Sequence, residues 1–161
     1  MIHPELERAN ETLLRHGLWG TELMQRLTVV EEALEWLNTP YHHHGRLKGV
    51  GVDCAMILAE GYQKCGIIEG YDPGFYPVDW HLHHDEERYL KGIEKFAAKV
   101  ELPLPGDVAL FQFGRCVSHG AIVLSWPIVL HAYVREGVIL EDASASRLGD
   151  RLRGFWSFWR K

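Results

Sequence analysis

Cys54 is the residue of this chain best placed to act as a nucleophile. It follows a glycine-containing loop (Gly49, Val50, Gly51) and Asp53, and the pattern predicts that it lies in the first turn of a helix. A thiol there faces unpaired backbone N–H groups and the positive end of the helix dipole, which favour the reactive thiolate. The same N–H groups can form an oxyanion hole, with Asp53 in the capping position. The alternative is that Cys54 is one more small, buried apolar residue.

Two histidines lie in segments that predict strands, within Ser118-His119-Gly120-Ala121 and Leu130-His131-Ala132. Adjacent strands of one sheet would place the two imidazoles side by side. A nucleophilic cysteine needs a base within hydrogen-bond reach, and that base needs an orienting group. Cys54, His119 and His131 can fill these roles in that order. The alternative is that both histidines are core residues bound to backbone carbonyls.

A zinc site is the main rival use of the same side chains. Cys116-x-x-His119 has ligand spacing, and Cys54 or His131 would complete the set, but a matching second pair is missing. The chain has three cysteines, an odd and low number that argues against a disulfide framework, and Cys65 is expected to be inert. We therefore predict no metal and no organic cofactor.

Several residues outside this set are candidates for contacts around a cleft. Histidines 42–44 and 81, 83 and 84 form two loop clusters, and among them His43 and His44 are predicted to contact substrate. Trp80 and Tyr76 are predicted to wall the groove, Trp80 as a substrate contact. Asp107 and Asp142 are candidate polar neighbours of the site. The simpler interpretation is that these loops are solvent-exposed surface.

The elements that must position these side chains change type along the chain. Periodic apolar residues predict helices first and alternating residues predict strands afterwards, which is typical of an α+β fold with an antiparallel sheet. Thr21 is the expected cap of the second helix. The expected helices cover residues 5–16, 21–37, 53–66 and 85–98, with a loop over 41–52, and the expected strands cover 106–113, 119–124, 128–134, 137–142 and 155–159, with a short helical turn over 143–149.

The length of 161 residues and a net charge of −5 suit one ordinary domain and give no basic face for nucleic acid. No apolar run approaches the roughly 18 residues of a membrane span. The polar, acidic start lacks the features of a signal peptide, so we expect synthesis in the cytoplasm and, for any role outside, another vehicle such as a virion.

Taken together, the motifs resemble the NlpC/p60 superfamily of cysteine peptidases. Thr39-Pro40-Tyr41 followed by a glycine loop and Asp53-Cys54 resembles the nucleophile region of that family. The run from Gly106 to Phe111 resembles the strand that comes next, and the segments around His119 and His131 resemble its catalytic-histidine strand and third catalytic position. Within the family, the chain is most similar to a subgroup encoded with phage-tail and gene-transfer-agent genes, which shares the Pro-Tyr-His loop, the insert with Pro77 and Trp80, and an aromatic final strand.

The resemblance implies a papain-like α+β core, with the nucleophile helix packed on an antiparallel sheet and an N-terminal helical extension over residues 1–26 beside a peptidase domain over 27–161. It implies hydrolysis of an amide in peptidoglycan stem peptides, with phage-tail proteins as further partners. Tyr41 occupies the place of a family tyrosine near the nucleophile, so Tyr41 and Asp53 are expected to support the oxyanion site.

Two departures from the family pattern concern the surroundings of Cys54. Ala55 and Met56 stand where the family has Ser and Gly, and histidines 42–44 replace a glycine pair, which affects substrate preference. Two other functions stay open: a structural tail-tip protein with an idle hydrolase site, and an amidase or acyltransferase acting on a substrate outside the cell wall.

Overall fold

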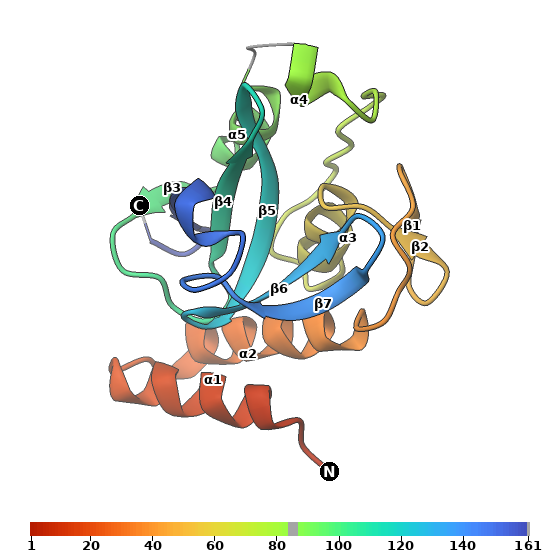
Figure 1. Ribbon diagram of the computed structural model, residues 1–161. Coiled ribbons are helices and arrows are strands. Elements are labelled where there is room, and N and C mark those ends of the chain that lie inside the picture. The colour runs from red at the N-terminus through yellow and green to blue at the C-terminus, as the bar shows by residue number, and fades with distance from the viewer. Residues whose placement is uncertain (84–86, 161) are drawn as a thin grey trace.

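The computed structural model describes residues 1–83 and 87–160. Its centre is an antiparallel sheet of six strands in the order β3-β8-β4-β5-β6-β7 (Figure 1). The α+β class and antiparallel sheet predicted from the sequence are confirmed. The strands are β3 (Ala98–Val100), β4 (Val108–Phe113), β5 (Cys116–Ser125), β6 (Ile128–Tyr133), β7 (Gly137–Asp142) and β8 (Leu152–Ser157).

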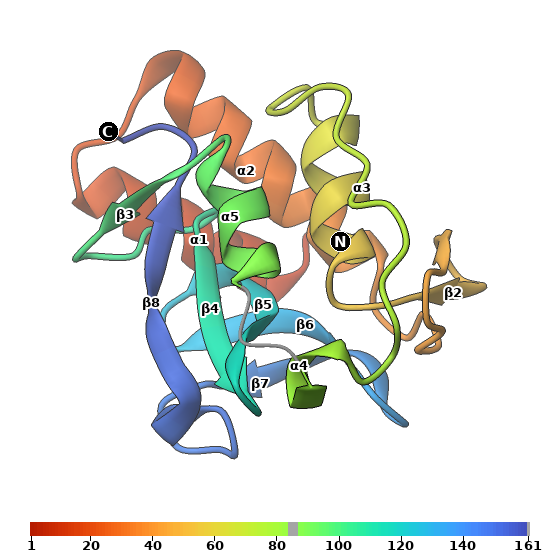
Figure 2. The same ribbon diagram turned by 90° about the horizontal axis from the view of Figure 1, so that it is seen from above.

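Helices pack on one side of this sheet. Figure 1 shows α1 and α2 together below the curled end of the sheet, and α3 beside β5 and β6; contacts join α1 with α2, α2 with α3, and α3 with β5. Viewed from above, α5 crosses β4 and β5 (Figure 2), and it contacts β5. The helices are α1 (Pro4–Arg15), α2 (Gly20–Glu35), α3 (Met56–Lys64), α4 (Trp80–His83) and α5 (Arg88–Glu94), with a 3-10 turn η1 (Gly149–Arg151).

The central strands are buried on both faces. Val108 and Leu110 of β4 belong to the larger apolar cluster under the helices, whereas Ala109 and Phe111 belong to a smaller cluster that also contains Leu148. This alternation is the period-two geometry of a strand. The segment between β7 and β8 therefore covers the face that the helices leave free, and the two catalytic-candidate strands β5 and β6 lie inside the molecule.

The elements differ from the sequence prediction where long-range pairing overrides local pattern. The predicted loop over 41–52 contains a small hairpin, β1 (Arg46–Leu47) and β2 (Gly51–Val52). The predicted helix over 85–98 has its described helical part only at α5, and the chain then pairs as β3 with β8. Thr21 lies inside α2 rather than at its cap, which is Trp19 without a side-chain hydrogen bond. The helical turn predicted over 143–149 lies later, at η1, and the last strand ends before residue 159.

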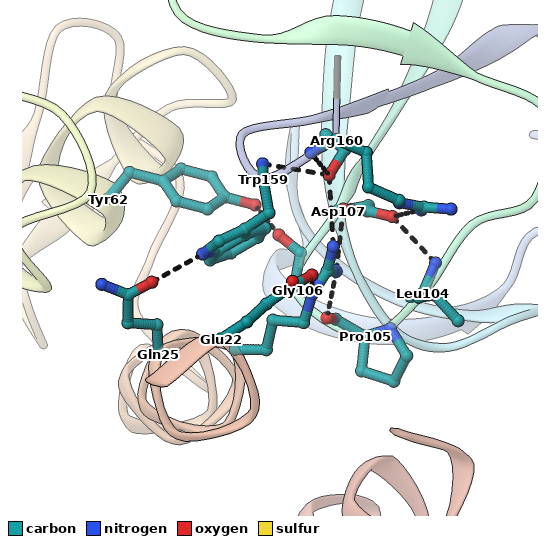
Figure 3. Close-up of polar contacts among 11 residues, drawn as sticks. Glu22, Gln25, Tyr62, Leu104, Pro105, Gly106, Asp107, Trp159 and Arg160 are labelled. Atoms are coloured by element: carbon teal, nitrogen blue, oxygen red, sulfur yellow. Dashed lines mark hydrogen bonds and ion pairs between the residues drawn. The ribbon is translucent and has the colours of Figure 1, made fainter. Parts of the chain in front are cut away.

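A buried ion-pair network ties α2 to the sheet and to the C-terminal segment (Figure 3). Arg26 is fully buried and donates to Asp107 Oδ1 at 2.9 Å, to Pro105 O at 3.0 Å and to Ser157 Oγ at 3.2 Å. Asp107 also accepts from Arg160. These partners give Asp107 a structural role in place of the expected one beside the nucleophile.

The same network bears on the predicted extension over residues 1–26. α2 runs unbroken from Gly20 to Glu35 through that boundary, and Arg26 binds the core of the sheet. The domain boundary after residue 26 therefore stays a proposal, because α2 continues through it without interruption. Over the described residues, no helix combines the length and the apolar character needed to cross a membrane.

Candidate active site

Cys54 lies in the turn that leads into α3, held by the side chain before it. Asp53 Oδ1 accepts hydrogen bonds from the N–H groups of Ala55 at 3.1 Å and Met56 at 2.9 Å, and the Asp53 carbonyl accepts from Ile57 N at 3.1 Å. This is the bonding of a helix cap. The regular helix begins at Met56, so Cys54 lies two residues before it, whereas the sequence predicts Cys54 within the first helical turn.

A β-bulge on β5 brings a carbonyl group to the thiol. Phe111 pairs with His119 and Gln112 pairs with Val117, which leaves Ser118 as an extra residue between the two pairs. Cys54 Sγ lies 3.6 Å from the Ser118 carbonyl oxygen. The thiol is therefore directed at the backbone immediately before His119.

The histidines of β5 and β6 form a hydrogen-bonded pair. His119 Nε2 lies 2.7 Å from His131 Nδ1, and the two rings are 5.0 Å apart and nearly perpendicular. His131 Nε2 lies 3.2 Å from Glu141 Oε1 on β7. The two imidazoles lie side by side on adjacent strands, as the sequence suggested. Glu141 adds a third residue to the hydrogen-bonded series, and the sequence analysis did not single it out.

Cys54 and His119 line one cavity of about 140 Å³. Within residues 1–83 and 87–160, no hydrogen bond joins the Cys54 thiol to either ring nitrogen of His119. Because catalytic hydrogen bonds are often formed only when substrate is bound, the shared cavity is the relevant geometric relation. The other residues that line it are Tyr41, His43, Asp53, Tyr76, Val78, Trp80, His81, Phe113, Ser118, Ala132, Tyr133 and Val134.

Burial sets the resting protonation of the pair. It raises the pKa of Cys54, and the charge of Asp53 raises it further, while the N–H groups of Cys54 and Ala55 act in the opposite direction. Burial also lowers the pKa of His119 well below its ordinary value, with smaller contributions from His131 and Arg147. The resting state is a neutral thiol beside a neutral imidazole. The thiolate favoured by the helix end alone is outweighed by desolvation.

Tyr41 reaches the same cavity from the loop after α2. It forms a parallel β-bridge with Val52, which places it beside the turn of Cys54. Burial raises the pKa of its hydroxyl, and a negative charge on Cys54, when that thiol ionises, or on Asp53 raises it further. The Tyr41 hydroxyl is therefore protonated and available as a donor.

The long insert between α3 and α5 is hydrogen-bonded through Asp53 to the turn that carries Cys54. Tyr76 Oη donates to Asp53 Oδ2 at 2.6 Å, and His44 N donates to the same oxygen at 2.8 Å. The ring nitrogens Nε2 of His43 and His44 lie 2.8 and 2.9 Å from the Tyr76 carbonyl oxygen. Sequence reasoning assigned His43 and His44 to substrate; the structure gives both a contact with the insert, and of the two it places His43 in the cavity wall.

A second, mostly apolar cavity of about 70 Å³ begins at the same thiol. It shares Cys54, Tyr76, Trp80 and Ser118 with the first cavity and lies under the insert. Trp80, predicted to contact substrate, thus stands between the two spaces. The apolar cavity continues along α3 and α5, past Leu58, Ala59, Tyr62, Ile68, Tyr71, Tyr89, Ile93, Phe96 and Phe158.

The remaining candidates lie elsewhere or outside the described residues. Asp142 binds Ser144 N and Oγ at 2.9 and 2.7 Å in an exposed turn. Cys65, at the end of α3, lies 3.7 Å from Thr28 O, and burial raises its pKa to about 11. His84 is not among the described residues. Among those that are, no group of three or more His, Cys, Asp or Glu side chains is arranged to hold a metal ion.

Comparison with known proteins gives the fold. The sequence matches no protein-family model and no curated protein. Its structure is similar to a lipoprotein-like NLP/P60 family protein from Staphylococcus aureus, with a TM-score of 0.64 and 19% identity over 89% of this chain and 43% of that one. An NlpC/P60 family protein from Bacillus cereus gives 0.64 and 17% over 84% and 40%. The NlpC/p60 domain of the peptidoglycan hydrolase SagA gives 0.54 and 20% over 81% and 96%.

These likenesses confirm that the chain has the NlpC/p60 fold expected from its motifs. The chain spans less than half the length of the Staphylococcus and Bacillus proteins and nearly the whole of the SagA domain. The shared part is therefore one domain of larger proteins.

Proposed function

We propose that this protein is a cysteine peptidase that hydrolyses an amide bond in peptidoglycan stem peptides. The observation that carries the proposal is that Cys54 and His119 line one cavity and that His119 is hydrogen-bonded to His131, in a fold shared with a peptidoglycan hydrolase domain. A nucleophile, a base and an orienting group are the parts that acyl transfer through a cysteine requires.

The neutral resting pair dictates the order of proton transfer. On rotation of the Cys54 side chain toward His119, the ring nitrogen Nδ1, which is not used by His131, takes the thiol proton as Sγ attacks the amide carbonyl. The oxyanion is stabilised by the Cys54 N–H group and the protonated Tyr41 hydroxyl. The imidazolium then gives its proton to the leaving amine, and water releases the acyl group from sulfur.

The walls of the two cavities suggest how a stem peptide would be held. The polar cavity carries His43, Tyr41 and His119, whereas the space behind Trp80 is apolar. We propose that Trp80 and His43 contact the peptide, while His44 acts through Tyr76. A phage-tail setting, with tail proteins as partners and delivery in a virion, is proposed from the sequence resemblance.

Digestion of purified peptidoglycan and of a free stem peptide, followed by mass spectrometry, tests this function. Wild type should cut the stem peptide and Cys54→Ala should not. Cys65→Ala is the matched control, because that thiol lies at the far end of α3. Cleavage that persists in Cys54→Ala would exclude Cys54 as nucleophile, and a folded wild type that cuts neither substrate would exclude stem peptides.

The apolar cavity favours one second candidate, an amidase or esterase for substrates that carry an apolar acyl group. Its space opens at Cys54 and is bounded by Leu58 and Tyr89. Nitrophenyl esters of increasing chain length distinguish the two functions. A rise in kcat/KM with chain length, together with no peptidoglycan cleavage, would favour the acyl substrate.

A further inference from the structure

We infer that Glu141 is a positioning residue that, held by Arg147, fixes the tautomers of both site histidines. The inference rests on the proposed role of His119 as base. Glu141 lies on β7, two residues beyond Ile139, which pairs with His131. Residues two apart on a strand share a face, so the carboxylate reaches the far side of the His131 ring.

The hydrogen bonds determine which ring nitrogen of each histidine carries a proton. An ionised carboxylate can only accept, so His131 Nε2, at 3.2 Å from Glu141 Oε1, carries a proton. In a neutral ring the other nitrogen is then unprotonated, so His131 Nδ1 accepts from His119 Nε2 at 2.7 Å. His119 Nδ1 is left with a free lone pair. That nitrogen is the one required to accept the proton of Cys54.

Arg147 keeps the carboxylate ionised and in place. Its Nη2 lies 2.9 Å from Glu141 Oε1, and its guanidinium lies 3.6 Å above the Tyr133 ring. The same ring lies 5.9 Å from the His119 ring and 5.6 Å from that of His131. Burial opposes ionisation of Glu141, but the Ser146 and Arg147 side chains lower its pKa.

The charges around His131 predict which way it responds. Burial lowers its pKa and Arg147 adds to this, whereas Glu141 and, from the turn, Glu136 raise it. Burial outweighs the two carboxylates and the net effect lowers the pKa of His131, so its ring is neutral at rest. Removal of the Glu141 charge would lower the pKa of His131 further. Removal of the acceptor as well would free the ring to take the other tautomer.

Glu136 offers a matched control. It also pairs with Arg147, and it is a half-exposed residue in the turn between β6 and β7. An effect that depends only on losing an ion pair with Arg147 would appear in Glu136→Gln as well as in Glu141→Leu. An effect on the histidines should require Glu141, because His131 Nε2 bonds to that side chain.

The experiment uses two readouts that need no substrate: side-chain nitrogen NMR of histidine-labelled protein, and the rate of Cys54 alkylation by iodoacetamide against pH in a Cys65→Ala, Cys116→Ala background. Wild type and Glu136→Gln should show the Nε2–H tautomer at both histidines. Glu141→Gln retains an acceptor and should keep the tautomers. Glu141→Leu should mix them and slow alkylation at neutral pH by roughly 10- to 100-fold, the loss found when the partner that orients a metal-binding histidine is removed.

Unchanged tautomers and alkylation in a folded Glu141→Leu would overturn the inference, as would an equal effect in Glu136→Gln. Circular dichroism and urea unfolding establish that each variant is folded. Failure of the proposed function looks different: the peptidoglycan digest would fail while the NMR and alkylation results stand. If Glu141→Leu leaves the tautomers unchanged while Cys54-dependent cleavage is intact, only the role of Glu141 is refuted.

Discussion

Gly120 is the position where a single added methyl group should disturb the turn of Cys54 from a distance. It follows His119 on β5, and a Cβ there would lie 2.6 Å from Tyr89 Oη, 2.8 Å from Leu58 Cδ1 and 3.2 Å from Leu110 Cδ2. Tyr89 Oη donates to the Cys54 carbonyl at 2.8 Å. Gly120→Ala should therefore push the tyrosine off the turn that carries the thiol.

The size of the effect follows from these distances. Ordinary contact begins at 3.4 Å, so the hydroxyl must retreat by 3.4 − 2.6 = 0.8 Å. Such a shift is enough to lose a hydrogen bond of 2.8 Å. Overpacking typically costs about 1–3 kcal/mol and a lost hydrogen bond about 1 kcal/mol. We expect Gly120→Ala to lower the free energy of unfolding by about 2–4 kcal/mol and to change the alkylation rate of Cys54.

Urea unfolding followed by tryptophan fluorescence, with Tyr89→Phe as partner variant, checks this reasoning. Tyr89→Phe alone removes the hydroxyl and should cost about 1 kcal/mol. It also removes the closest clash of the new methyl group, so the double variant should be more stable than the sum of the two losses predicts. Strict additivity, or a loss below about 0.5 kcal/mol in Gly120→Ala, would refute the argument.

Three further perturbations follow from the network geometry. Tyr76→Phe removes the 2.6 Å hydrogen bond to the buried Asp53 carboxylate and should lower the free energy of unfolding in urea by about 1.5–3 kcal/mol. Proteolysis of the insert should also become faster. An unchanged urea midpoint would contradict this prediction. Arg26→Met combined with Arg160→Met removes both cations that bind Asp107 and should cost about 3–5 kcal/mol in urea unfolding. Much of this loss should be recovered by adding Asp107→Leu; equal losses with and without that change would argue against a buried-charge penalty. Burial lowers the pKa of His119 below the value of about 6.5 that it has in the unfolded chain, so the free energy of unfolding should be highest above that pH and fall as the pH drops toward the folded pKa. The fall should be less steep in His119→Leu. Parallel curves of unfolding free energy against pH for the two proteins would count against this.

The sequence carried enough information to locate the triad candidates, because each depends on a local signal. Asp53 and Cys54 follow a glycine loop at a helix start, and His119 and His131 lie in runs of apolar residues that predict strands. These signals need no knowledge of which strand pairs with which. The type and order of the elements that carry these residues were therefore predictable, while ends such as the start of α3 depended on the turn at Cys54.

Glu141 could not be found in the same way. In the sequence it is an acidic residue near the end of a strand, next to the equally acidic Asp142. Only the register of β6 against β7, His131 with Ile139, puts one carboxylate against the imidazole and turns the other into solvent. The bulge at Ser118 is similar, because it exists in the pairing of β4 with β5 and in neither strand alone.

The two oxygens of Asp53 connect the nucleophile to the part of the fold that sequence reasoning described least well. Oδ1 holds the N–H groups of Ala55 and Met56 at the start of α3, and Oδ2 holds Tyr76 Oη and His44 N. The insert also supplies Trp80 to both cavities. A ligand that moves the insert therefore acts on the same carboxylate that orders the turn of the thiol. Under the proposed function, substrate specificity and the geometry of Cys54 both depend on the Asp53 side chain.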